Sequence, residues 1–479
     1  MKSLVLAEKP SVARDIARVL GCHKNISGAI EGSNYIVTWA LGHLVTLADP
    51  EEYDKKFKAW DMSYLPMVPK KWELVVIKQT SKQYHNVKTQ LFRKDVSEII
   101  IATDAGREGE LVARWILDKS GCHKPIRRLW ISSVTDKAIK EGFAHLKDGR
   151  AYNDLYHAAR SRAEADWLVG INATRALTCK YNAQLSCGRV QTPTLAMIAH
   201  REQQIRSFKP EDYYGLRCTT SVTGGSVGTM ASIVTWTWQQ KKSGSLRSFN
   251  KDLITGLDKK LKNQTLTVTD VHTSSKRTPS PGLYDLTELQ RDANKRFGFS
   301  AKETLNIMQS LYEHHKVLTY PRTDSRYIGT DIVPTIKERL KACNIGPYKK
   351  YIPELLKKPL KTSKAFVDDK KVSDHHAIIP TEEYVQMEHM SNNERKIYDL
   401  VVRRFISVLY PAFEYEQTTL KAEAAGETFT AKGKVIKAAG WKAVYADAAS
   451  SGSSASQYDA YGDYEDSEEQ LAEYVIDFH

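Results

Sequence analysis

The chain has 479 residues, enough for several domains that each bury a core. Hydrophobic residues make up 41% of it. No apolar run approaches the roughly 18 residues of a membrane span, and the apolar run at the start is too short for a signal peptide. We therefore expect a cytoplasmic protein with no membrane partner. None of the six cysteines forms a C-x-x-C pair, which argues against a zinc ribbon and for reduced thiols.

The charge of the chain is unevenly distributed. The formal net charge is +13, but residues 447–479 hold nine acidic residues and no Lys or Arg. Without that end, 70 basic residues face 57 − 9 = 48 acidic ones, a net charge of +22. Such an excess favours a polyanionic partner, because phosphate contacts release counterions. The alternative is a solvated basic surface, which charge alone does not exclude.

The first 145 residues alternate short apolar runs with helical patterns. Strands are predicted at 3–7, 98–102 and 129–131, and helices at 10–20 and 107–117. This alternation is typical of an α/β domain with a mostly parallel sheet, whose ligands bind at the carboxyl ends of the strands. Glu8 and Asp104 each follow a strand, so both acids are expected to face one crevice.

The rest of the chain changes character several times. Residues 150–205 predict helices, and residues 216–238 predict strands around a turn at Gly224-Gly225. Another strand is expected at 266–271, and strands return at 418–420 and 428–434. Between them lies a helical region with two capping boxes, Asp285 with Glu288 and Ser300 with Glu303. Residues 446–458 are rich in Ser, Ala and Gly and predict a flexible linker, and no internal repeat is visible.

An acidic motif opens the helix at residue 107. Asp104 and Glu108 stand in Asp-Ala-Gly-Arg-Glu-Gly-Glu, directly after a predicted strand. Its glycines let backbone approach a ligand, and its carboxylates can bind a divalent cation together with Glu8. This combination predicts a magnesium site for phosphoryl transfer. The alternative is that the acids only stabilise the helix dipole.

A tyrosine motif, Thr-Tyr-Pro-Arg-Thr-Asp-Ser, covers residues 319–325. The oxygen of Tyr320 can attack phosphorus and form a stable ester, and Arg322 can hold phosphate oxygens through paired donors. The residue between them, Pro321, restricts the backbone and keeps the two side chains in a defined relation. The commoner meaning of such a string is a buried Tyr near a surface Arg.

Several further residues suit contact with a nucleic acid. The helix over 155–178 offers cations and a ring for phosphate contact and base stacking, although Trp167 and Trp60 also suit a core. A protonated imidazole at His375 or His376 can bind a phosphate oxygen, and at least one of the two is expected to be structural. The candidate contacts on the helix are Arg162, Trp167 and Arg175, and Trp60 is a further, isolated candidate. The loop after this helix either binds phosphate or connects two helices, and its candidate contacts are Ser186, Cys187, Gly188, Arg189, Val190 and Gln191.

Together the motifs resemble one family. From Lys2 to about Val444 the chain resembles the type IA DNA topoisomerases, most closely the bacterial topoisomerase III branch. The resemblance rests on five motifs in the family's order. They are Glu8-Lys9-Pro10-Ser11, the acidic motif at 104–110, Gly188-Arg189-Val190-Gln191, the tyrosine motif at 318–325 and the segment from His375 to Thr381.

The resemblance implies a multidomain fold with α/β, α and β parts. It implies an N-terminal Toprim domain, which is Rossmann-like, and a β arch that carries helical domains to form a toroid. The expected division is Toprim at 1–148, a helical DNA-binding domain at 149–213, the β arch at 214–280 and 411–445, the helical domain with the tyrosine at 281–410 and a flexible acidic tail at 446–479.

The resemblance also implies a reaction. Tyr320 would attack single-stranded DNA to form a 5′-phosphotyrosine link without ATP, and religation would follow passage of another strand. The implied roles are Glu8 as metal ligand or acid–base group, Asp104 and Glu108 as Mg²⁺ ligands, Lys9 and Arg322 as contacts to the scissile phosphate, and His375 as their support. A monomer that acts on single-stranded regions of DNA is expected.

Two departures from the family pattern leave alternatives open. Gly106 stands where the family often has a third acid, which predicts weaker or rearranged metal binding. The chain also lacks the further helical segment that the family carries after the region of Trp441. A second hypothesis is therefore a relative that binds single strands without completing strand passage. A third is a Toprim nuclease or primase-like enzyme, in which Tyr320 has no role.

Overall fold

The computed structural model describes residues 1–132, 134–222, 232–372 and 375–446. The described chain forms two compact units, Met1–Gln204 with Gly282–Phe405 and Ile205–Pro281 with the chain from Ile406. The predicted turn at Gly224-Gly225 and the acidic tail from residue 447 lie outside the described residues. Among the described helices, none is long and apolar enough to cross a membrane.

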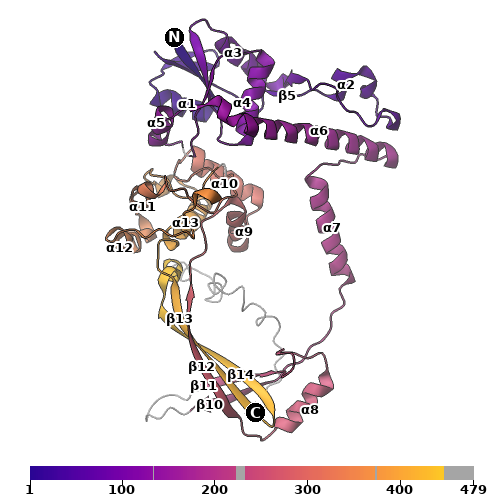
Figure 1. The fold of residues 1–479 in the computed structure, drawn as a ribbon, viewed down its shortest axis with the longest axis vertical. Helices are drawn as coiled ribbons and strands as arrows, with labels where there is room; N and C mark the ends of the chain where they lie inside the picture. Colours follow the sequence, from indigo (N-terminus) through magenta and orange to yellow (C-terminus); the bar gives the residue numbers. More distant parts are fainter. Residues whose placement is uncertain (133, 223–231, 373–374, 447–479) are drawn as a thin grey trace. The chain divides into compact units, whose positions relative to one another are not determined.

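The first unit begins with a seven-stranded sheet in the order β2-β3-β4-β1-β7-β8-β9 (Figure 1). Strand β1 pairs in parallel with both β4 and β7, and β7 pairs in parallel with β8. Towards the edges the pairing is antiparallel, between β2 and β3, between β3 and β4, and between β8 and β9. The strands are β1 (Lys2–Ala7), β2 (Lys24–Ile26), β3 (Ala29–Glu31), β4 (Tyr35–Trp39), β7 (Val96–Ala102), β8 (Ile126–Arg128) and β9 (Lys147–Asp148).

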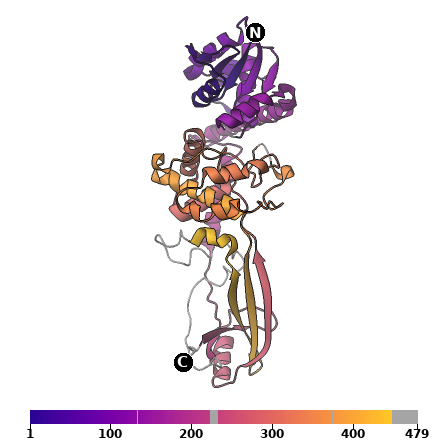
Figure 2. The ribbon, with the colours of Figure 1, turned by 90° about the vertical axis from the view of Figure 1, so that its left-hand side faces the viewer.

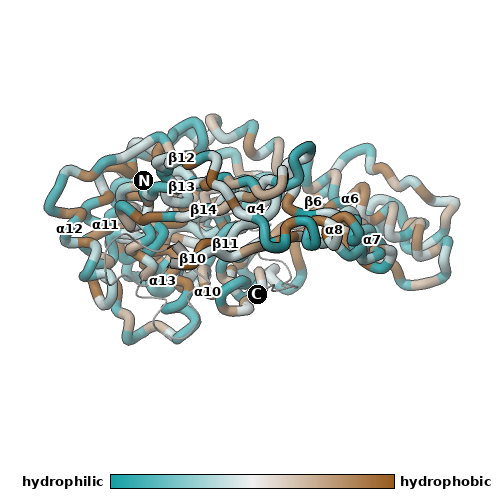
Figure 3. Tube along the Cα trace, turned by 90° about the horizontal axis from the view of Figure 1, so that it is seen from below, coloured by the Kyte–Doolittle hydropathy of each residue, from teal (hydrophilic) through white to brown (hydrophobic). Residues whose placement is uncertain are grey.

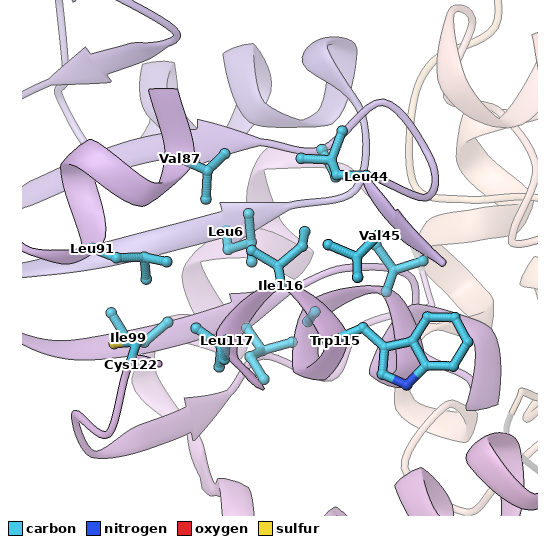
Figure 4. Close-up of a cluster of buried hydrophobic side chains, with 14 of the residues drawn as sticks. Leu6, Leu44, Val45, Val87, Leu91, Ile99, Trp115, Ile116, Leu117 and Cys122 are labelled. Carbon is cyan, nitrogen blue, oxygen red and sulfur yellow. The ribbon is translucent and has the colours of Figure 1, made fainter. Parts of the chain in front are cut away.

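Helices cover both faces of this sheet, as its central parallel strands require. Alternate residues of β1 point to opposite cores: Leu4 and Leu6 join one cluster, and Val5 and Ala7 join the other. Figure 4 shows the first cluster, in which Leu6 and Ile99 lie among side chains from α3 and α4. The helices of this part are α1 (Pro10–Val19), α3 (Ser81–Leu91), α4 (Arg107–Ser120) and α5 (Asp136–Ala144).

The predicted elements of this part are found with small shifts, and one strand is displaced. We predicted a strand at 129–131, whereas β8 ends at Arg128. The reason is that β8 takes its register from Ile99–Ile101 of β7, and the chain then leaves the sheet. Leu129 is buried, and it and Ile131 pack against the core that α1 and α5 cover. Their apolar character reports burial and not strand pairing.

Two long helices follow the α/β part, and a small sheet lies within its sequence, between β4 and α3. Helix α6 (Asn153–Tyr181) precedes α7 (Gln191–Ser207), with the loop at 182–190 between them. The small sheet pairs β5 (Val45–Leu47) with β6 (Leu74–Val76), and α2 (Pro50–Tyr53) follows β5. Trp167 of α6 packs against the same core as Trp72 and Leu74, which joins α6 to the α/β part.

The second segment of this unit, residues 282–405, is helical. The N-cap half of each predicted capping box is confirmed: Asp285 Oδ1 accepts from the N–H of Glu288 at 2.7 Å, and Ser300 Oγ accepts from the N–H of Glu303 at 3.1 Å. The helices are α9 (Leu286–Phe297), α10 (Ala301–Glu313), α11 (Ile336–Ala342), α12 (Ile352–Leu356) and α13 (Asn392–Ser407). Short 3₁₀ turns lie at Val333–Thr335, Gly346–Lys350, Asp369–Lys371 and Met387–His389.

The second unit is built on a five-stranded antiparallel sheet in the order β10-β11-β14-β13-β12, seen along its length in Figure 2. Its core gathers Trp236, Trp238 and Phe429 with Ile254 and Leu257 of α8. The hydropathy of each residue is drawn in Figure 3. The elements are β10 (Arg217–Val222), β11 (Ser232–Gln239), α8 (Lys251–Leu261), β12 (Thr267–Thr278), β13 (Phe413–Ala424) and β14 (Glu427–Ala438), with a 3₁₀ turn at Gly440–Tyr445.

Candidate active site

The crevice at the carboxyl ends of β1 and β7 holds two carboxylates. Glu8 follows β1 and Asp104 lies two residues after β7, and because these strands are parallel neighbours their ends meet. The N–H of Asp104 donates to Glu8 Oε2 at 3.1 Å. The prediction that both acids share one crevice is therefore confirmed.

The environment of the two acids opposes their ionisation. Burial, and then the charge of Asp104, raise the pKa of Glu8 to about 7. Burial also raises the pKa of Asp104. Like charges so close repel, so the pair shares protons at neutral pH unless a cation neutralises it. A pair of oxygen ligands in this state suits a hard divalent cation.

A close backbone approach shapes the acidic loop. A Cβ atom on Gly109 would lie 2.1 Å from the carbonyl oxygen of Asp104, so only glycine fits there. That carbonyl oxygen accepts from Arg128 Nη2 at 2.8 Å. Arg128 is fully buried, and its Nη1 also donates to the carbonyl of Thr103 at 2.8 Å. Its Nε donates at 3.0 Å to Glu110, which is likewise fully buried. Arg128 and Gly109 thus hold Asp104 at its place.

The third predicted ligand lies apart from the pair. Glu108 is more than half exposed, and its Oε1 accepts from Arg162 Nη1 at 2.8 Å. Within the described part of the chain, no group of three or more His, Cys, Asp or Glu side chains is arranged to hold a metal ion. Gly106, where a further acid was expected from the family pattern, faces open space. Glu8 and Asp104 thus fit a cation as a pair, and the role of Glu108 stays a prediction.

Tyr320 lies at this crevice. Its hydroxyl donates to Asp104 Oδ2 at 3.4 Å, and its N–H donates to the carbonyl of Ser132 at 3.1 Å. The segment that carries it is extended and pairs with residues 377–381, where Leu318 bridges Pro380. The phenol ring is partly buried, and this burial, followed by the charges of Asp104 and Glu8, raises its pKa. The phenol is therefore neutral until a base takes its proton.

The two adjacent histidines have different surroundings. The ring of His375 stacks on Tyr320 with centroids 4.2 Å apart, and it is nearly parallel to the ring of Trp130, whose centroid lies 6.5 Å away. Both of its ring nitrogens are buried without a hydrogen-bond partner among the described residues. Burial lowers its pKa to about 3, so the expected protonated imidazole is not favoured here. His376 instead pairs with Ser132 Oγ at 3.1 Å and with the carbonyl of Ala377, which is the structural role expected for one of them.

The two predicted phosphate contacts are placed differently. Lys9 Nζ lies 2.5 Å from Glu313 Oε1 of α10, so its charge is already paired. Arg322 is exposed, and its charge counteracts the raised pKa of Tyr320. A phosphate at Tyr320 is therefore open to Arg322, whereas Lys9 reaches it only by leaving or sharing Glu313.

The loop before α7 is exposed at Ser186, Arg189, Val190 and Gln191. The N–H of Cys187 donates to Thr174 Oγ1 at 2.9 Å and the N–H of Gly188 donates to Thr192 Oγ1 at 3.1 Å, so these two residues are anchored. Ser186 Oγ accepts from Gln191 Nε2 at 3.3 Å.

A series of ion pairs runs from this loop to the acidic motif. Arg189 lies 2.6 Å from Asp166, Asp166 lies 3.8 Å from Arg162, and Arg162 lies 2.8 Å from Glu108. These four side chains are each about half exposed, so the arginines can exchange carboxylates for phosphates at little cost.

Other predicted DNA contacts lie in packed surroundings. Arg175 is buried, and its Nη1 donates to the carbonyls of Phe57 and Ala59 while its guanidinium stacks on Trp60. Trp167 donates from Nε1 to the carbonyl of Ala48 at 2.9 Å and packs, partly buried, against the core. Half of Trp60 is exposed. For Arg175 and Trp167 the structure shows a stabilising contact, and their DNA contacts stay predictions.

Four residues of this site were not predicted from the sequence. Arg128, Glu110 and Ser132 hold the acidic loop and the tyrosine segment, and Glu313 pairs with Lys9. The role of Arg128 could not be predicted, because an isolated arginine in a sequence usually indicates a surface residue. Glu110 stood in the quoted motif, but its burial depends on two arginines from elsewhere in the chain.

Comparison with known proteins identifies the class to which this fold and site belong. A family model described as "DNA topoisomerase" matches residues 150–469, and one described as "Toprim domain" matches residues 3–134. The chain belongs to the DNA topoisomerase family. A solved structure of full-length topoisomerase I from Thermotoga maritima is similar in fold, with a TM-score of 0.65 at 23% identity. That likeness covers 92% of this chain and 67% of the other and confirms the expected topoisomerase fold.

Individual relatives carry one name. The chain is 64% identical over 444 residues to a protein named DNA topoisomerase 3 from Bacillus cereus ATCC 14579 and 60% identical to one of that name from Bacillus subtilis 168. The resemblance to the topoisomerase III branch is thereby confirmed. These matches cover 93% of this chain but only 59% and 60% of the two relatives. The chain thus spans about three fifths of the length of these relatives.

Proposed function

We propose that this chain cleaves and rejoins one DNA strand through a 5′-phosphotyrosine at Tyr320, as a type IA DNA topoisomerase. The observation that carries this proposal is the 3.4 Å contact between the Tyr320 hydroxyl and Asp104, in a crevice shared with Glu8. A phenol beside two carboxylates and an exposed Arg322 is suited to nucleophilic attack on a phosphodiester. A surface tyrosine outside any site would need none of these neighbours.

In the proposed reaction, Asp104 accepts the phenolic proton while the Tyr320 oxygen bonds to phosphorus. The bond from phosphorus to the 3′ oxygen breaks, and Glu8, whose pKa is about 7, donates a proton to that oxygen. The exposed guanidinium of Arg322 stabilises the charge on the non-bridging oxygens. The 3′ hydroxyl reverses these steps at religation, and because the ester conserves the bond energy no ATP is consumed.

We also propose that Mg²⁺ serves this site, held by Asp104 and by Glu8 in its ionised form, that is, after Glu8 has given up its proton. A bound Mg²⁺ would neutralise the carboxylate pair and the phosphate that approaches it. What supports this is the donor set, two neighbouring carboxylates in which burial, and then the charge of Asp104, raise the pKa of Glu8. Substitution Glu8→Gln should weaken the dependence of cleavage on Mg²⁺ concentration and reduce cleavage itself.

The partner in this proposal is DNA with single-stranded regions, handled by a monomer in a bacterial cytoplasm. The exposed loop at 186–190 and the arginines of the ion-pair series would contact its backbone. His375 would support the site through its ring stack on Tyr320, since its pKa of about 3 leaves it neutral.

A covalent-trapping gel tests the chemistry. Wild type with Mg²⁺ and a labelled single-stranded oligonucleotide should leave a denaturant-stable adduct, which Tyr320→Phe abolishes. A matched control is Tyr384→Phe, an exposed tyrosine outside the site, which should leave adduct yield unchanged. If wild type forms no adduct, or Tyr320→Phe still forms one, the proposal is wrong.

A second candidate function is the alternative left open by the sequence, in which the chain binds single strands without completing strand passage. Relaxation of a negatively supercoiled plasmid, measured beside adduct formation, separates the two candidates. Adduct with relaxation supports the full cycle, whereas adduct without relaxation supports the second candidate.

A further inference from the structure

A lysine-rich segment lies beside the residues that follow Tyr320. Residues 357–371 carry six lysines, all exposed, which we call the lysine track: Lys357, Lys358, Lys361, Lys364, Lys370 and Lys371. The same stretch holds only two acidic residues, Asp368 and Asp369. The proposed chemistry at Tyr320 makes no use of this segment.

Hydrogen bonds join the track to the nucleophile segment. Ser325 Oγ donates to the carbonyl of Lys371 at 2.8 Å. Ile328 donates from its N–H to Phe366 at 2.9 Å and accepts at its carbonyl from the N–H of Asp368 at 3.1 Å. Ile328 is fully buried, so this pairing is part of a core. Hydrogen bonds and the buried Ile328 therefore hold the track against the chain that leaves Tyr320.

The two acids of the segment do not neutralise its lysines. Asp369 accepts from the N–H and the hydroxyl of Thr330, at 2.7 and 2.9 Å. Asp368 accepts from the backbone N–H of Lys370 and lies 4.0 Å from Lys371. In the described part of the chain, the other five lysines form no ion pair. Such an uncompensated row of exposed cations attracts a phosphate backbone.

An aromatic ring stands within the row. Tyr327 is partly buried, and Lys371 Nζ lies 4.6 Å above its ring and 3.2 Å from its hydroxyl. A ring beside cations is the arrangement that holds single strands by stacking and phosphate contact. Lys371 has this local role, so the remaining lysines are the better probes of DNA contact.

We propose that the lysine track binds the backbone of the DNA strand downstream of the cleavage site. This inference rests on the proposed function, in which Tyr320 carries the 5′ phosphate of that downstream strand. The covalent link fixes the strand to the piece of protein that holds the track. The lysines therefore stay bound to the downstream strand when the released 3′ end moves away.

The test uses single-stranded oligonucleotides that extend to different lengths on either side of the mapped cleavage site. The variant replaces Lys361, Lys364 and Lys370 by Gln. A control with the same charge loss replaces Lys82, Lys88 and Lys94, which are exposed on and after α3. Affinity is measured by fluorescence anisotropy across salt concentrations, and adduct yield is measured on the same oligonucleotides.

In wild type, added downstream nucleotides should tighten binding and raise adduct yield, and the track variant should lose that gain. Its slope of log affinity against log salt should fall by about 0.7 for each phosphate that the variant no longer binds, hence about 2 for three lysines. The control should keep the wild-type gain. An unchanged gain in the track variant, or a loss that follows upstream length instead, would overturn the inference. Absence of any adduct in wild type would instead refute the proposed function.

Discussion

The acidic loop of the site depends on one missing side chain, and Gly109→Ala tests this dependence. The added Cβ would lie 2.1 Å from the carbonyl oxygen of Asp104, far inside van der Waals contact. Either α4 or that carbonyl must move. If the carbonyl moves, its 2.8 Å hydrogen bond from the buried Arg128 is broken. The substitution thus acts on the placement of Asp104 and not only on packing.

Three contributions set the expected change in the free energy of unfolding. Overpacking costs about 1–3 kcal/mol, and a broken hydrogen bond to a buried charged group costs about 1.5–3 kcal/mol. Alanine offsets about 1 kcal/mol through its better helix propensity. We expect Gly109→Ala to lower the free energy of unfolding by about 3 kcal/mol. Where the variant is still folded, cleavage should fall further than stability, because Asp104 is displaced.

The neighbouring Gly106 offers a matched control. It has an extended backbone, with φ −179°, and a Cβ on it would meet nothing within 4 Å. Gly106→Ala should leave stability within about 1 kcal/mol of wild type. Urea unfolding and the covalent-trapping gel measure both variants. If Gly109→Ala is as stable and as active as Gly106→Ala, the close approach does not position the acidic loop.

Three further predictions concern the surroundings of the site. Burial lowers the pKa of His376 to about 4, so the free energy of unfolding should fall as pH falls from 6.5 to about 4, by up to ~1.4 kcal/mol per pH unit. In thermal melts, stability should decline less steeply over this pH range in His376→Asn than in wild type. An equal decline in the two proteins would contradict this prediction. Arg128→Met removes one partner of the buried Glu110 and should lower the free energy of unfolding in urea by about 3–5 kcal/mol. Arg127→Met, at the exposed neighbouring residue, should lower it far less. Glu313→Gln releases Lys9 from its partly exposed ion pair with Glu313, which is worth about 1 kcal/mol. The substitution should therefore tighten single-strand binding about fivefold, measured by fluorescence anisotropy. Unchanged or weaker binding would show that the ion pair does not compete with DNA.

Local patterns in the sequence predicted much of the secondary structure of this protein. Apolar runs and their spacing located β1, β7 and the helices after them, and Asp285 and Ser300 cap their helices as predicted. Such features depend on neighbours within a few residues, which a sequence displays directly. The shared crevice of Glu8 and Asp104 was also predictable, because the ends of parallel strands meet at one edge.

What only the tertiary structure decided was how each charged or aromatic side chain is used. Arg175 holds backbone carbonyls, Glu108 pairs with Arg162 away from the other acids, and His375 is buried as a neutral ring. Arg128 passed unnoticed in the sequence although it holds the acidic loop. The physical reason is that burial and partner choice depend on residues distant in the chain. Composition and spacing name the groups that chemistry needs, whereas packing decides which of them are free to perform it.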